Sequence, residues 1–135
     1  MPFVIDISTG SGVPIFRQVV DQIRLAVATG RLAEGEQLPS VRALAERLVV
    51  NPNTVAKAYA ELTRQRVIEA RQGLGMFIAP PRQMYTRTER ARRLAPLLDA
   101  VVNEGISLGF GPEELVDSLR QRLAKVKFDE PAKPV

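Results

Sequence analysis

The sequence predicts a mainly α-helical protein that carries one small β-hairpin. Apolar residues recur at helical spacing in several segments, each of which begins at a favourable capping residue. A short break at Val49–Pro52 separates two of these segments. Directly after them, residues 68–78 alternate between polar and apolar about a turn that holds two glycines. Together these observations indicate helices followed by a hairpin, with further helices beyond it.

The break at residues 49–52 predicts a helix-turn-helix. Ser40 is well placed to cap the first helix, which we expect to end near Leu48. Pro52 lacks an N–H group and moves Asn51 out of the helical region, so this helix cannot continue. The same pair can start a helix, because Asn51 is a good N-cap and proline suits the first helical position. We expect the second helix to bury a stripe made of Val55, Ala58, Tyr59 and Leu62.

The hairpin is expected to pair Ile68–Arg71 with Met76–Ile78 across the turn Gln72–Gly75. A hairpin directly after a helix-turn-helix predicts a winged helix-turn-helix. In such folds the second helix enters the DNA major groove and the hairpin, called the wing, touches the flanking backbone. Arg71, Gln72 and Gly73 are placed to contact phosphates or a minor groove at the wing tip. An ordinary surface hairpin is the alternative interpretation.

Polar residues at the start of the second helix point to DNA recognition. Asn53, Thr54 and Lys57 face away from the buried stripe, where an amide, a hydroxyl and an ammonium group can bond to base edges or phosphates. On an isolated helix the plainer explanation, a completed cap and a solvated charge, would be preferred, and the adjoining hairpin reverses that preference. The function predicted is sequence-specific DNA binding; the alternative is a winged helix used as a protein-interaction module.

The runs LPSVRALAERL, NPNTVAKAYAEL and IEARQGLGMFI, in this order, resemble the winged-helix domain of the GntR family of bacterial transcription regulators. The resemblance covers residues 1–80 and departs from the family pattern at two positions. Met76 stands where threonine is frequent, and Arg66 stands where a glycine often ends the recognition helix. The resemblance implies that DNA is contacted at the following positions: Arg42, Asn51, Pro52, Asn53, Thr54, Lys57, Gln72 and Gly73.

The composition limits the other classes of function. The chain has 135 residues, a formal net charge of +4 and neither cysteine nor histidine. Disulfides, Cys/His metal sites and catalysis by a cysteine or histidine are therefore excluded. Asp and Glu are scattered over expected helix surfaces, so we expect no enzyme, no cofactor and no metal. There is no apolar run of membrane-spanning length and no signal peptide, so we expect a cytoplasmic protein without a membrane partner.

The segments on either side of the helix-turn-helix are expected to be helical as well. Residues 14–29 form an amphipathic helix that supplies the third wall of the core, whereas Val4–Ile7 is either a short strand or a docked arm. After Pro80–Pro81, residues 82–93 are rich in arginine. They lie either along the DNA backbone or at a solvated helix start.

Two helices are expected beyond the wing. The first spans about Thr88 to Asn103, and Pro96 either kinks it or marks its beginning. Residues 105–111 form a turn, and Pro112 opens the last helix. We therefore divide the chain into a DNA-binding domain at 1–80, a helical hairpin at 81–127 and a disordered tail at 128–135.

The two C-terminal helices predict a homodimer. A hairpin of this size cannot bury two apolar stripes by itself, and a second copy of the chain is the simplest partner for a protein that binds two-fold DNA sites. The residues expected at this interface are Leu94, Leu98, Val101, Val102, Leu115, Leu119 and Leu123.

The length of the chain places the resemblance in the short YtrA-type branch of the family. Larger members carry an effector-binding domain for which this chain has no room. Members of the short branch dimerise through a C-terminal helical pair and often repress genes for ABC-type transporters. The resemblance thus implies a homodimeric repressor of double-stranded DNA at an inverted repeat. An unidentified small-molecule effector would have to bind between these helices or at the dimer interface.

Overall fold

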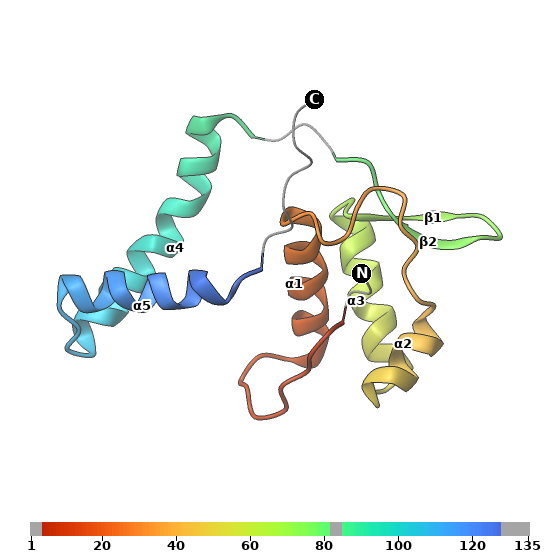
Figure 1. Cartoon of the computed structure of the whole chain (residues 1–135), viewed down its shortest axis with the longest axis horizontal. Coiled ribbons are helices and arrows are strands. Elements are labelled where there is room, and N and C mark those ends of the chain that lie inside the picture. The colour runs from red at the N-terminus through yellow and green to blue at the C-terminus, as the bar shows by residue number, and fades with distance from the viewer. Residues whose placement is uncertain (1–3, 82–84, 128–135) are drawn as a thin grey trace. The chain divides into compact units, whose positions relative to one another are not determined.

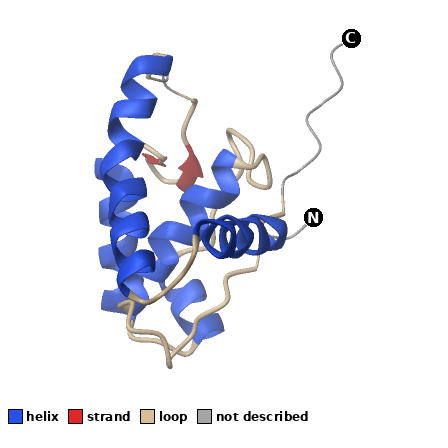
Figure 2. Ribbon diagram, turned by 90° about the vertical axis from the view of Figure 1, so that its left-hand side faces the viewer, coloured by secondary structure: helices blue, strands red, loops and turns tan. Residues whose placement is uncertain are grey.

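The structure is a computed structural model that describes residues 4–81 and 85–127. These residues separate into two compact units, an N-terminal unit (residues 4–81) and a C-terminal unit (residues 85–127). Both are helical apart from one hairpin, as Figure 2 shows. Two expectations lie outside the described residues: the first arginine of the arginine-rich segment, Arg82, and the disordered tail at 128–135.

The N-terminal unit is a winged helix (Figure 1). Its elements in chain order are α1 (Ile15–Ala28), α2 (Val41–Leu48), α3 (Pro52–Arg64), β1 (Ile68–Arg71) and β2 (Gly75–Ile78). Helix α3 packs against both α1 and α2, and β1 follows it into the antiparallel hairpin. This order confirms the predicted helix-turn-helix and wing. The second strand begins one residue earlier than expected, because Gly75 pairs with Arg71 and does not belong to the turn. The largest fully buried side chains at the centre are Val19, Val20, Ile23, Val55, Leu62, Ile68 and Ile78.

A third segment supports the base of the wing. The backbone of residues 35–38 bonds to β2: the Gly35 N–H donates to the Ile78 carbonyl at 2.9 Å, and the Leu38 N–H donates to the Met76 carbonyl at 2.9 Å. Because an isolated two-stranded hairpin is marginal in water, this added pairing stabilises the wing.

Residues 4–8 dock on α1 and form no strand. The Gln22 side chain accepts the Asp6 N–H at 2.9 Å, and the Gln18 side chain accepts the Ser8 N–H at 2.8 Å. Ile5 is buried in the core beneath this segment. Of the two alternatives for residues 4–7, the structure therefore supports the docked arm.

Three helices end with the same backbone motif. In each, a residue one or two positions past the helix end has a positive φ, and the N–H of the following residue bonds back to a carbonyl five residues earlier, as in a Schellman cap. The bonds are Val50 to Ala45 (3.0 Å), Val67 to Leu62 (3.0 Å) and Phe110 to Gly105 (2.9 Å). The positive-φ residues are Val49, Arg66 and Gly109. Glycine adopts this conformation without strain, whereas Val49 and Arg66 do not.

Replacing Val49 with glycine should stabilise the protein. Val49 has φ 56° and is 88% exposed, so its side chain contributes little burial while its branched Cβ is strained. We expect Val49→Gly to raise the free energy of unfolding by about 1 kcal/mol, since relief of left-handed strain exceeds the entropy cost of glycine. Thermal unfolding should show a Tm higher by roughly 5 °C. Val13→Gly, an exposed loop valine without positive φ, is the control and should give no increase; a lower Tm for Val49→Gly would contradict the strain argument.

The C-terminal unit consists of α4 (Arg87–Ser107) and α5 (Pro112–Lys125). Thr86 caps α4 by accepting the Glu89 N–H at 3.1 Å. Helix α4 runs through Pro96, which decides between the two alternatives: this proline lies inside the helix and does not begin it. Because proline has no N–H, the carbonyl of Arg92 lacks its usual donor there.

The expected turn at residues 105–111 is wrong at its start. Residues 105–107 continue α4, and the turn begins only after Ser107. Gly105 is buried where α5 crosses, and a Cβ built on it would lie 2.3 Å from Leu115 Cδ2. This glycine therefore permits close helix packing, a role that a local pattern does not distinguish from a turn. Gly109, with φ 92°, is the glycine that ends the helix.

Candidate nucleic-acid interface

The cap of α3 leaves the next two polar side chains free. Asn51 has extended backbone angles, and its Oδ1 accepts the Asn53 N–H at 2.8 Å, as expected of an N-cap. Pro52 occupies the first helical position and is exposed. Within the described part of the chain, the side chains of Asn53 and Thr54 make no hydrogen bond, with Asn53 exposed and Thr54 half-buried. Capping thus falls to Asn51, and Asn53 keeps its amide available for another molecule.

Lys57 lies one turn further along α3 and is exposed. Its Nζ is 3.9 Å from the centre of the Phe16 ring on α1, in a cation–π contact. The Arg17 guanidinium lies 5.2 Å from the same ring. This contact could not be predicted from the sequence, since nothing local relates residue 16 to residue 57.

Arg42 and the start of α3 border a common hollow. A surface hollow of about 540 Å³ beside the helix-turn-helix is lined by Arg42, Ala45, Glu46, Val49, Val50, Asn51 and Pro52. The first turn of α2 and the cap of α3 are therefore neighbours on one surface. This brings Arg42 together with the predicted contact residues of the recognition helix.

The wing tip is a tight turn with exposed residues. The Leu74 N–H donates to the Arg71 carbonyl at 2.9 Å, and Gly73 has φ 75° with open space around it. Gln72 and Gly73 are exposed at this tip. Arg71, in contrast, is held within the wing: its Nε lies 3.3 Å from Glu69 Oε2, and its guanidinium lies 4.3 Å from the centre of the Phe77 ring. Of the three predicted wing contacts, only Arg71 already has partners.

Tyr59 fixes α3 relative to the segment before α2. Its ring is buried, and its hydroxyl donates to the Pro39 carbonyl at 2.7 Å. Burial raises the pKa of the Tyr59 hydroxyl well above its ordinary value of 10.0, an effect only partly opposed by the positive charge of Arg47. The neutral form, which donates this hydrogen bond, is therefore the form that the fold stabilises.

The Tyr59→Phe variant should test this contact through its pH dependence. At neutral pH, loss of the hydrogen bond should cost about 1 kcal/mol of stability. In the wild type, the unfolded tyrosine ionises near pH 10 while the folded one stays neutral, so stability should be lost as the pH rises through and above 10. Urea unfolding at pH 7 and pH 10.5 should show a smaller alkaline loss in Tyr59→Phe. Tyr85→Phe, at an exposed tyrosine, should leave stability at pH 7 unchanged; an equal alkaline loss in the wild type and Tyr59→Phe would contradict the assignment.

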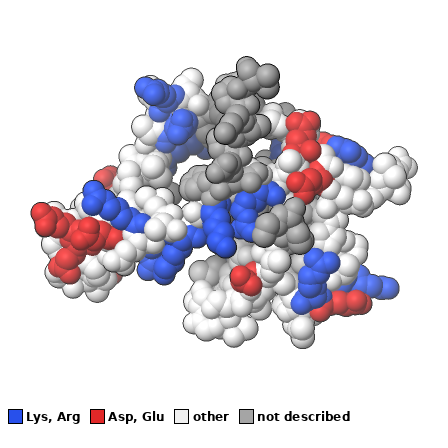
Figure 3. Space-filling model, viewed as in Figure 1, with Lys and Arg blue, Asp and Glu red and all other residues white. Residues whose placement is uncertain are grey.

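In each unit, basic side chains are accompanied by acidic ones. On the face drawn in Figure 3, each unit shows both Lys or Arg and Asp or Glu side chains. In the arginine-rich segment, Glu89 pairs with Arg92 at 3.1 Å and with Arg93 at 3.2 Å. On α3, the hydrogen bond from Arg64 lowers the pKa of Glu61. Basic charge available to a nucleic acid is therefore local, which suits a net charge of only +4.

The C-terminal unit exposes an apolar stripe. Six of the residues expected at a dimer interface are between 46% and 57% exposed: Leu94, Leu98, Val101, Val102, Leu119 and Leu123. Leu115 differs, since it is half-buried against Gly105 inside the helical hairpin. The hairpin thus uses Leu115 for its own packing and leaves the other six side chains about half exposed.

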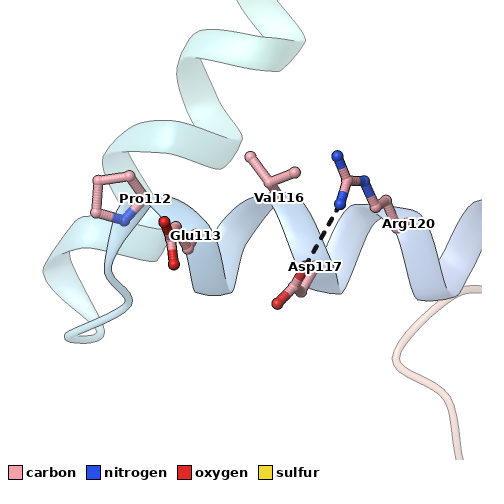
Figure 4. Close-up of a pocket in the computed structure, with 5 residues that line it drawn as sticks. All are labelled: Pro112, Glu113, Val116, Asp117 and Arg120. Carbon is pink, nitrogen blue, oxygen red and sulfur yellow. Dashed lines mark ion pairs between the residues drawn. The ribbon is translucent and has the colours of Figure 1, made fainter.

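The hollow on the surface of α5 is open to solvent and does not form an enclosed ligand site. Figure 4 shows a shallow hollow of about 370 Å³ against α5, where Asp117 and Arg120 approach within 3.9 Å. All five of its lining residues come from α5, so we assign it no ligand. The described residues hold no cluster of three potential metal ligands, and none of their helices is long and apolar enough to cross a membrane.

The helix-turn-helix, the uncommitted polar side chains at the start of α3 and the adjoining wing define a winged-helix DNA-binding protein as the class. Comparison with known proteins identifies the family. The sequence model described as "Bacterial regulatory proteins, gntR family" matches residues 16–78. The chain is 32% identical over 124 residues to the HTH-type transcriptional repressor YtrA of Bacillus subtilis (strain 168), covering 92% of this chain and 95% of that protein.

Solved structures agree with this assignment. A protein described as a transcriptional antiterminator from Listeria monocytogenes EGD-e is 34% identical with a TM-score of 0.79, covering 96% of this chain and 98% of that one. YtrA from Sulfolobus acidocaldarius, a GntR-family transcription factor, is 30% identical with a TM-score of 0.52, covering 90% and 98%. The chain therefore belongs to the GntR family of bacterial transcriptional regulators, and its relatives place it with the YtrA-type members.

Proposed function

We propose that this regulator is a sequence-specific repressor that binds an inverted-repeat operator as a homodimer. Each protomer inserts the start of α3 into a major groove, where Asn53 and Thr54 contact base edges and Lys57 a base or a phosphate. Arg42 and the capped Asn51–Pro52 turn lie against the adjacent backbone, and Gln72 and Gly73 contact the flank. Repression follows when the bound dimer blocks polymerase at the promoter.

One observation carries this proposal: Asn51 caps α3 with its side chain, so Asn53 is not needed for the fold. An exposed amide at the start of a recognition helix, with no partner among the described residues, is suited to bond adenine in a bidentate manner. Lys57 needs only to leave the Phe16 ring to reach a phosphate, which is an exchange of one favourable contact for another.

The exposed stripe of the C-terminal unit supports the homodimer. Six neighbouring apolar side chains, each about half exposed, cost free energy in water, and a two-fold contact between copies removes them from it. A symmetric dimer also matches an inverted repeat, because each protomer then meets an identical half-site. The name of the Bacillus subtilis relative, a transcriptional repressor, supports repression, and the resemblance to the short branch favours transporter genes as targets.

The proposal is tested by selecting bound sequences from a random duplex DNA pool at two salt concentrations. We expect an inverted repeat whose spacing gives the distance between half-sites, and binding that weakens as salt rises. Because one structural relative is described as an antiterminator, RNA transcripts of the selected sequences should be included and should not compete. Salt-sensitive binding without any enriched motif would contradict base recognition. Absence of binding at low salt would favour the protein-interaction module.

A further inference from the structure

The wing extends beyond the backbone pairing that supports it. Residues 35–38 bond to the part of β2 between Met76 and Ile78, and no backbone bond of this segment reaches the turn at 72–74. A two-stranded ribbon is flexible where no third strand or core covers it. The tip that would contact DNA is therefore the part of the wing with the least backbone support.

The side chain of Gln37 holds this tip. Its Nε2 donates to the Leu74 carbonyl at 2.7 Å, a bond between residues 37 positions apart. The backbone of Gln37 lies opposite Phe77 in an isolated bridge, which sets the side chain at the end of the paired region. Gly75 makes room for the amide: a Cβ there would lie 2.8 Å from Gln37 Nε2. The close approach and the hydrogen bond together fix the turn relative to residue 37.

The same short segment also holds the recognition helix. Two residues after Gln37, the carbonyl of Pro39 accepts the hydrogen bond of the buried Tyr59 hydroxyl on α3. Residues 37–39 are thus bonded to the wing turn at one end and to α3 at the other. We call these three residues the linking segment.

We propose that Gln37 is a positioning residue for DNA binding, which holds the wing tip at a set distance from the recognition helix so that both contact one duplex together. The inference rests on the proposed function. Its physical basis is preorganisation: a tip that is already in place loses less conformational freedom on binding than one that must be ordered. Gln37 itself contacts neither base nor phosphate in this account.

Removing the Gln37 side chain should weaken DNA binding only by loosening the contact that the wing makes. We expect Gln37→Ala to lower affinity for the selected operator by roughly tenfold, while the preferred base sequence is unchanged. Gln37→Glu keeps the length of the side chain but cannot donate to the Leu74 carbonyl, so it should behave like Gln37→Ala. The matched control is Gln121→Ala, at an exposed glutamine of α5, which should bind as the wild type does. The Tm should stay close to that of the wild type, because Gln37 is exposed.

Two measurements separate positioning from a general structural role. Hydroxyl-radical footprints of Gln37→Ala should lose protection at the flanks contacted by the wing and keep it in the major-groove half-sites. In a double-mutant cycle, Gln37→Ala should lose most of its effect when Gln72→Ala has already weakened the wing contact. Uniform loss of protection together with a large fall in Tm would overturn the inference, and so would fully additive effects.

Different results contradict the proposed function and the positioning role of Gln37. If the wild type selects no sequence and binds no duplex, the proposed function is wrong. If the wild type binds its operator and Gln37→Ala binds it equally well, with unchanged flanking protection, the proposed function stands and the positioning role of Gln37 is overturned.

Discussion

Replacing Leu98 with glutamate should convert the protein to a monomer and reduce operator affinity by at least about a hundredfold. Leu98 lies on α4 within the exposed apolar stripe and is not needed for the packing of Gly105 against Leu115. A charge there must be buried without a partner if the dimer forms, which makes association unfavourable. Without association, the two half-sites are bound independently, and the gain from linking two binding events is lost.

Sedimentation velocity and titration with full operators and half-sites measure these two effects. The Leu98→Glu protein should sediment as a monomer and bind a half-site as the wild type does, because the N-terminal unit is unchanged. The control is Leu25→Glu, at a similarly exposed leucine of α1 outside the stripe, which should remain dimeric. A dimeric Leu98→Glu protein would mean that the stripe on α4 and α5 is not the interface.

Replacing Asn53 with alanine should relax sequence preference and leave general DNA affinity intact. A lost bidentate contact to a base costs about 1–3 kcal/mol, so the ratio of specific to nonspecific affinity should fall by about 5- to 150-fold. Asn53 suits this test because its side chain does not cap α3; alanine at Asn51 would also remove the cap and confuse stability with recognition. The measurement is affinity for the operator and for an unrelated duplex of equal length at one salt concentration.

Two variants accompany Asn53→Ala. Lys57→Ala removes a positive charge. If Lys57 contacts a phosphate, this variant should weaken binding to both duplexes and reduce the slope of log affinity against log salt concentration by about one. Asn103→Ala removes an exposed amide from α4 and should alter neither affinity. If Asn53→Ala weakens binding to both duplexes to the same extent, the assignment of Asn53 to base recognition is wrong.

The helices of the DNA-binding unit were predictable because their signals are local. Ser40 and Asn51 cap helices through N–H groups two or three residues away, and Pro52 lies directly after its cap. The hairpin was predictable for the same reason, since alternation and the glycine turn lie within residues 68–78. The order of these elements was enough to indicate the family, and the comparisons confirm it.

The incorrect prediction of a turn at Gly105 shows the limit of such local patterns. A glycine near the end of a helical pattern indicates a turn, and both Gly105 and Gly109 fit that description. Only the position of Leu115 across the hairpin distinguishes them, and the sequence does not contain that distance. The dimer prediction was affected in the same way, because Leu115 belongs to the stripe by spacing yet packs inside the hairpin.

The element order, the caps and the polar residues at the start of α3 follow from local sequence, because each depends on neighbours within about one helical turn. How these elements are held together follows only from the folded chain. The Tyr59–Pro39 and Gln37–Leu74 bonds join residues 20 and 37 positions apart, and Lys57 meets Phe16 across two helices. Such contacts depend on how the chain returns on itself, which is set by packing of the whole core and leaves no periodic signal in the sequence.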